Sequence, residues 1–148
     1  MTENPLILRD QVCFALYSAQ HAVTGLYRPL LDELGITYPQ FLVLLALWEA
    51  DGRSVSQIGA VLRLDSGTLS PLIKRLEQQG LVERRRDAAD ERRVRVHLTP
   101  DGHRLREQVS DVPRQVAVAA GLTPESLFAL RDTLNSITAS IHHDQSKD

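Results

Sequence analysis

The period of the hydrophobic pattern changes at Gly80, and this change limits the possible folds more than any other feature of the sequence. Before Gly80, apolar residues recur at helical spacing in two short segments, which predicts helices over residues 54–62 and 65–79. After Gly80, apolar residues alternate with polar ones, which predicts strands over residues 81–86 and 93–98 joined by a polar loop. The middle of the chain should therefore hold two helices followed by a β-hairpin.

Longer helical patterns flank this middle segment. They predict helices over residues 5–34, 38–50, 100–120 and 124–141, with the remaining tail frayed. Pro29 should kink the first of these helices or begin a new turn. The apolar run within the second predicts that it is the most buried helix. The expected boundaries are the N-caps Thr37, Ser54 or Ser56, Asp65 and Thr99, and the stops Gly35, Gly80 and Gly121. The predicted fold class is mainly α with a small β-hairpin.

The charges of the chain are unevenly distributed, although the net charge is only −2. Residues 63–95 contain nine Lys or Arg and six Asp or Glu, a balance of +3, whereas the remaining residues contain eight and thirteen, a balance of −5. A basic middle between acidic flanks is expected when one module contacts phosphates, although a solvated surface can have the same composition.

Other classes of function find little support in the sequence. The longest apolar run is too short to span a bilayer, and the N-terminus lacks a secretory-signal pattern, so we expect a cytosolic protein. The single cysteine, Cys13, excludes an internal disulfide and a multi-cysteine metal site. The histidines lack the spacing of a metal site, and no catalytic motif stands out. We therefore expect no metal, no cofactor and no enzymatic activity.

The helix over residues 65–79 and the hairpin are candidates for contact with DNA. In a helix-turn-helix, the second helix lies in the major groove. The face opposite its apolar residues carries small polar and basic residues: Ser66, Thr68, Ser70, Pro71, Lys74 and Arg75. The hairpin carries arginines at its base and on its second strand: Arg84, Arg85, Arg86, Arg92, Arg93 and Arg95. Such a hairpin after a helix-turn-helix is typical of a wing whose tip enters the minor groove, whereas the helix alone could equally be an amphipathic surface helix.

Two segments resemble the MarR family of transcriptional regulators. Residues 90–102 resemble its wing signature, with Asp-x-Arg, a strand and Leu-Thr-x-x-Gly, and residues 66–77 resemble its recognition helix. The resemblance covers nearly the whole chain and implies a winged helix-turn-helix repressor that binds a pseudo-palindromic operator as a homodimer. It implies that Arg92 is the minor-groove arginine and that Asp90 orients it. The expected parts are a dimerisation helix (1–36), a DNA-binding domain (37–99) and C-terminal dimerisation helices (100–148).

The segments 11–17, 26–30 and 34–40 resemble the OhrR branch of this family, the repressors of organic-hydroperoxide resistance. The resemblance implies that Cys13 is oxidised and that tyrosines at the positions of Tyr27 and Tyr38 bond to it across the dimer, and Tyr17 is a further candidate. Because Tyr27 follows Cys13 by 14 positions, the two are ~21 Å apart on one helix, so contact requires a second copy. Tyrosine hydroxyls would favour the thiolate, which is the nucleophile toward a peroxide.

Oxidation would give a sulfenic acid that this chain cannot resolve with a second cysteine, so a mixed disulfide with a small thiol or overoxidation should follow. Three alternatives remain open at this stage. The chain could be a MarR-type repressor released by a small aromatic ligand, a thiol peroxidase, or a protein-interaction module without a DNA role. In the first case Cys13 would be incidental, a small buried hydrophobe.

Overall fold

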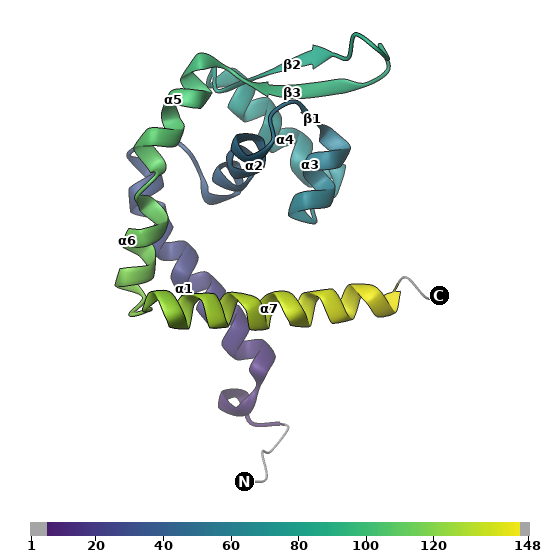
Figure 1. The fold of residues 1–148 in the computed structure, drawn as a ribbon. Coiled ribbons are helices and arrows are strands. Elements are labelled where there is room, and N and C mark those ends of the chain that lie inside the picture. Colours follow the sequence, from purple (N-terminus) through teal and green to yellow (C-terminus); the bar gives the residue numbers. More distant parts are fainter. Residues whose placement is uncertain (1–5, 146–148) are drawn as a thin grey trace. The chain divides into compact units, whose positions relative to one another are not determined.

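The computed structural model describes residues 6–145, which form helices and three short strands (Figure 1). The chain divides after Asp111 into two compact units. The elements of the first unit are η1 (Leu8–Asp10), α1 (Val12–Asp32), α2 (Tyr38–Glu49), β1 (Arg53–Ser54), α3 (Val55–Leu62), α4 (Ser66–Gln78), β2 (Val82–Arg86), β3 (Val94–Leu98) and α5 (Pro100–Val109). The second unit holds α6 (Val112–Ala119) and α7 (Pro124–Gln145). None of the described helices is long and apolar enough to cross a membrane.

The strands form one antiparallel sheet in the order β1-β3-β2. The hairpin register pairs Val82 with Leu98 and Arg85 with Arg95, which confirms the expected hairpin. Strand β1 was not predicted, because two residues are too few to show an alternating pattern. The hairpin packs on the helices of the first unit, and its loop projects past them in Figure 1.

The core of the first unit is built around α2, as the apolar run within it predicts. Phe41, Val43, Leu44 and Leu47 are all buried on this helix. Thr37 caps it together with Gln40: the Gln40 N–H donates to Thr37 Oγ1 at 3.3 Å, and the Thr37 N–H donates to Gln40 Oε1 at 2.9 Å. This capping box satisfies two of the N–H groups that a helix start leaves without partners.

Two predicted helices are interrupted. At the N-terminus, Gln11 has extended backbone (φ −86°, ψ 117°) and separates η1 from α1; Pro5 lies outside the described residues. The helix predicted over residues 100–120 is split into α5 and α6 at Ser110 and Asp111. The break coincides with Pro113, whose ring would clash with the carbonyl of residue 109 in a continuous helix.

At the C-terminus the predicted frayed tail is partly wrong, because α7 continues to Gln145. Its start is fixed by Thr123, whose Oγ1 accepts the Ser126 N–H at 3.2 Å. The other predicted caps and stops are confirmed. Ser54 caps α3, and Gly35 and Gly80 have positive φ (72° and 74°), a conformation that suits glycine at a helix end.

Candidate functional site

Helices α3 and α4 are joined by a tight three-residue turn. Arg63 in this turn adopts the left-handed conformation with φ 56°, which is uncommon for a residue other than glycine. A Cβ on Gly59 would lie 2.7 Å from the Leu64 carbonyl oxygen, so α3 can approach the turn this closely only with glycine there. Asp65 then caps α4 by accepting the Thr68 N–H at 2.7 Å, and this hydrogen bond holds the pKa of Asp65 below its usual value. The pair of helices has the geometry of a helix-turn-helix.

Helix α4 separates an apolar face from a polar one. Leu69, Ile73 and Leu76 are buried, and Leu72 is half-buried. The six predicted contact residues of this helix are exposed: Ser66, Thr68, Ser70, Pro71, Lys74 and Arg75. The exposed face of α4 therefore carries small polar groups near its start and the two cations Lys74 and Arg75 further along, as the sequence predicts.

Pro71 lies inside α4, which begins at Ser66. Pro29 likewise lies inside α1. In each case the residue four positions earlier is a glycine, Gly67 or Gly25. Because a proline ring crowds the carbonyl of that residue, a flexible glycine at this position lets the helix continue.

Several arginines of the hairpin are occupied by intramolecular ion pairs. Arg84 Nε lies 3.3 Å from Glu77 Oε2 on α4, Arg85 pairs with Glu83, and Arg93 Nε lies 3.6 Å from Asp90 Oδ2. The structure gives no ion pair to the remaining four basic candidates within the described chain: Lys74, Arg75, Arg86 and Arg92. Within α4 and the hairpin, these four side chains can neutralise an external anion without first losing an ion-pair partner.

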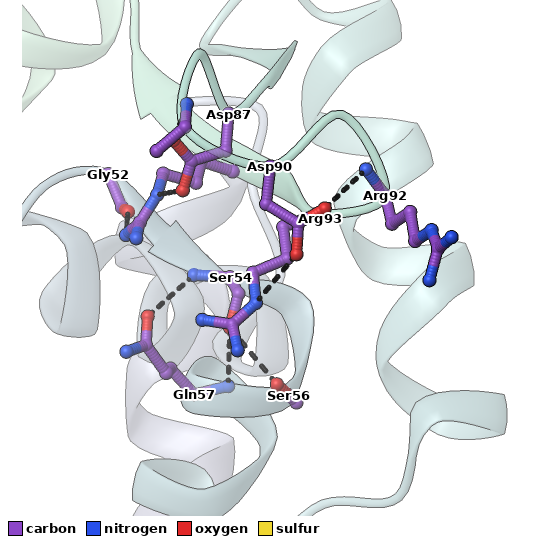
Figure 2. Close-up of polar contacts among 10 residues, drawn as sticks. Gly52, Ser54, Ser56, Gln57, Asp87, Asp90, Arg92 and Arg93 are labelled. Carbon is purple, nitrogen blue, oxygen red and sulfur yellow. Dashed lines mark hydrogen bonds and ion pairs between the residues drawn. The ribbon is translucent and has the colours of Figure 1, made fainter.

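Arg95 anchors the hairpin loop to the start of β1. Its Nε donates to Asp87 Oδ2 at 2.8 Å, and its Nη1 donates to the Gly52 carbonyl at 2.9 Å, beside β1 (Figure 2). The hydrogen bond from Arg95 lowers the pKa of the Asp87 carboxyl, and the Ala89 N–H, 3.0 Å away, adds to this effect. Composition alone placed Arg95 among the basic groups of the hairpin, whereas its contacts make it a structural clamp.

Asp90 holds the tip of the loop. Its Oδ1 accepts the backbone N–H of Arg92 at 3.1 Å, while its Oδ2 faces Arg93. Figure 2 shows the side chain of Arg92 extending away from this carboxylate, with its guanidinium group apart from the other labelled side chains. Asp90 therefore fixes the backbone of Arg92 and leaves the guanidinium of Arg92 exposed.

The thiol of Cys13 is free and exposed on the first turn of α1. It is flanked by exposed apolar side chains, among them Val12, Phe14 and Leu16. In this single chain Cys13 is thus not a buried hydrophobe. Tyr17, one turn further on, packs its ring edge against His21 with 4.4 Å between ring centroids.

Tyr27 and Tyr38 lie side by side, with ring centroids 4.8 Å apart, although they come from different helices. Both rings pack near Phe41, at 5.9 Å and 6.3 Å. Burial raises the pKa of both phenols, and the neighbouring Tyr38 adds to the rise at Tyr27. Tyr27 also lies on the same helix as Cys13, 14 positions later, so these two residues are ~21 Å apart along α1.

Exposed apolar residues are concentrated on α1 in the first unit and on α7 in the second. In the first unit they include Val12, Phe14 and Leu16 on α1. In the second unit four lie along α7, Phe128, Leu130, Ile137 and Ile141, and Val118 lies on α6. No side chain of α7 among those described is buried, which is unusual for a long helix with so many apolar residues.

One polar network near the tyrosine pair was missed at the sequence level. Gln40 Nε2 donates to Gln79 Oε1 at 3.0 Å, and Gln79 Nε2 donates to the Gly35 carbonyl at 2.6 Å. The Thr-x-x-Gln spacing of Thr37 and Gln40 indicates the capping box. Nothing local to the sequence indicates the contact with Gln79, which is 39 positions away.

Comparison with known proteins agrees with this geometry. The family described as "Transcriptional regulator SarA/Rot" matches residues 25–109. The organic hydroperoxide resistance transcriptional regulator of Bacillus subtilis (strain 168) is 44% identical over 135 residues, which cover 91% of this chain and 92% of that protein.

Two solved structures have the same fold. A structure of reduced AbfR bound to DNA superposes with a TM-score of 0.79 at 32% identity and covers 97% of this chain and 98% of that one. BpsR of Bordetella bronchiseptica, whose DNA binding is regulated by 6-hydroxynicotinic acid, superposes with a TM-score of 0.82 at 28% identity and covers 91% and 98%. The winged helix-turn-helix predicted from the sequence is confirmed, and the chain belongs to the MarR family of transcriptional regulators, in its organic-hydroperoxide-resistance (OhrR) branch, rather than to any class of enzymes.

Proposed function

We propose that this chain is a homodimeric, DNA-binding repressor that organic hydroperoxides release from its operator by oxidising Cys13. The observation that carries the proposal is the placement of the exposed free thiol of Cys13 ~21 Å along α1 from Tyr27, whose ring packs on Tyr38. Within one chain they cannot meet. Two copies of α1 crossing in antiparallel orientation would bring each Cys13 to the tyrosine pair of the other copy.

The DNA-binding part of the proposal rests on α4 and the hairpin. Helix α4 exposes Ser66, Thr68, Ser70 and Pro71 near its start, which lets its backbone approach a groove floor, and Lys74 and Arg75 can meet phosphates. Arg92 at the wing tip suits the negative potential of a minor groove. A relative with 32% identity has been solved on DNA.

The homodimer rests on the exposed apolar residues of α1 and of α7. A chain that left these faces in water would expose large apolar patches, which usually mark interfaces. A second copy of the chain can cover these apolar faces without any other protein. The two-fold symmetry of the resulting dimer matches a pseudo-palindromic operator.

The proposed reaction is a two-electron oxidation of sulfur. The Cys13 thiolate attacks the distal oxygen of the hydroperoxide, the O–O bond breaks, and the leaving alkoxide takes up a proton to become an alcohol. The product at Cys13 is a sulfenic acid. A small thiol then forms a mixed disulfide with it and releases water. The apolar flank of Phe14 and Leu16 favours an organic hydroperoxide over hydrogen peroxide.

The test is DNA binding of the reduced protein before and after oxidation. A labelled duplex from the region upstream of the chain's own gene is titrated at fixed salt, then exposed to cumene hydroperoxide with free cysteine, alongside the variant Cys13→Ser. The proposal expects release of the wild type and continued binding of the variant. If both stay bound, Cys13 is not the switch.

A second candidate is release by a small aromatic ligand. A groove of about 380 Å³ lies between α1 and the start of α2, with His21, Arg28 and Tyr38 in its lining. BpsR, a relative with the same fold, is regulated by 6-hydroxynicotinic acid. Release of Cys13→Ser from DNA by this compound would favour the second candidate.

A further inference from the structure

Gln40 is unusual because its polar side chain is 1% exposed among the apolar residues of α2. Both of its functional atoms have partners: Oε1 accepts the Thr37 N–H at 2.9 Å, and Nε2 donates to Gln79 Oε1 at 3.0 Å. Leaving a buried amide group without a hydrogen-bond partner costs free energy, because water cannot replace the lost partner. These hydrogen bonds therefore resist being broken.

Gln79 completes the network from the other side. It directly follows α4, and its Nε2 donates to the Gly35 carbonyl at 2.6 Å. The amide of Gln79 therefore bonds both to the turn between α1 and α2 and to Gln40 in the first turn of α2. The C-terminal end of α4 is tied by two hydrogen bonds to one short segment, residues 35–40.

The same segment carries Tyr38. Tyr38 follows Thr37 directly, and its ring packs on Tyr27 at 4.8 Å. A displacement of the tyrosine pair that moved the start of α2 would therefore change the positions of Thr37 and Gln40. Because Gln79 bonds to this segment at both amide atoms, the end of α4 must follow the displacement or lose both bonds.

We propose that Gln79 is a positioning residue that couples the orientation of α4 to the turn carrying Tyr38. This inference rests on the proposed function, in which α4 reads DNA and Tyr38 belongs to the sensor. Gln79 itself contacts neither the thiol nor DNA in this proposal. It transmits movement of residues 35–40 to the C-terminal end of α4.

The first experiment needs neither DNA nor hydroperoxide. Thr37→Val removes the hydroxyl that caps α2, and backbone amide shifts of residues 74–79 are recorded by NMR in the full-length protein. The change should shift these amides in the wild-type background and leave them nearly unmoved in Gln79→Ala. Equal shifts in both backgrounds would overturn the inference, whatever the fate of the redox proposal.

The second experiment measures the oxidation response itself. Coupling between two sites is typically worth about 5- to 150-fold in affinity. We expect the wild type to lose DNA affinity by a factor in this range when cumene hydroperoxide is added. Gln79→Ala should bind DNA when reduced, but its affinity should fall by a much smaller factor on oxidation. Gln108→Ala, an exposed glutamine on α5, is the matched control and should respond as the wild type does. An undiminished response in Gln79→Ala would contradict the inference.

Gln79→Glu separates the two bonds and guards against misfolding of the alanine variant. Its carboxylate can still accept from Gln40 but cannot donate to Gly35, so an intermediate response is expected. Failure of the wild type to respond to the hydroperoxide would refute the redox proposal alone, because the NMR experiment still decides the role of Gln79.

Discussion

The distribution of ion pairs predicts how steeply DNA binding depends on salt. Among the described basic residues of α4 and the hairpin, four have no internal ion pair: Lys74, Arg75, Arg86 and Arg92. If each contacts one phosphate, a dimer neutralises about eight, and log K falls with log salt at a slope of about −7. Affinity should then fall about 10⁴-fold between about 50 and about 200 mM salt.

Two variants distinguish a residue that contacts DNA directly, Lys74, from one that anchors the hairpin loop, Arg95. Lys74→Gln removes one contact from each protomer and should flatten the slope by about 2 per dimer. Arg95→Gln breaks the bonds to Asp87 and Gly52 and should weaken binding at every salt concentration, because the loop that carries Arg92 loses its anchor. Its slope should stay within about 1 of the wild type.

Fluorescence anisotropy with the labelled upstream duplex, repeated over a salt series, measures both quantities. Arg104→Gln is the matched control, since Arg104 pairs with Asp101 on α5, outside α4 and the hairpin. If Arg95→Gln flattened the slope as much as Lys74→Gln, Arg95 would contact DNA directly and the clamp reasoning would be refuted.

Three further predictions concern the fold and its titrating groups. Ile73→Ala, at a site with 0% exposure, should lower the free energy of unfolding by about 2–5 kcal/mol in urea, and a loss under about 1 kcal/mol would contradict the burial of this α4 face. Tyr27 and Tyr38 should ionise above pH 10 in an ultraviolet titration, and Tyr27→Phe should remove one of the two ionisation steps. Because the pKa values of both phenols are raised on folding, their contribution to the free energy of unfolding is present below pH 10 and is lost as pH rises through the raised values. Asp65→Ala should lower the melting temperature relative to Asp65→Asn, which keeps a capping oxygen. Since the pKa of Asp65 is lowered on folding, the advantage of the wild type over Asp65→Ala should be complete above the ordinary value of 3.8 and disappear as pH falls through the lowered one.

The local features of the fold could be predicted from the sequence because each depends on neighbouring residues. Thr37 and Asp65 cap helices through bonds to residues three positions later, and Gly80 marks the change from helix to strand. The break between α5 and α6 was missed, although Pro113 with Val109 rather than a glycine four positions earlier indicates it.

The long-range contacts could not be predicted in this way. Arg95 reaches Gly52 across 43 positions, and Gln40 reaches Gln79 across 39. Charge counting groups Arg95 with the other arginines of the hairpin, although its hydrogen bonds engage it within the protein. The same limit applies to the tyrosine pair, because nothing in the sequence places Tyr27 and Tyr38 at 4.8 Å from each other within one chain.

In the proposed switch, oxidation of Cys13 and release of DNA are one event. Increasing amounts of cumene hydroperoxide, with free cysteine present, are added to the protein bound to its labelled duplex. Intact mass and anisotropy are then measured on the same samples. We expect the fraction of DNA released to rise in proportion to the fraction of Cys13 that carries the mixed disulfide. Complete modification of Cys13 with the DNA still bound would contradict the account.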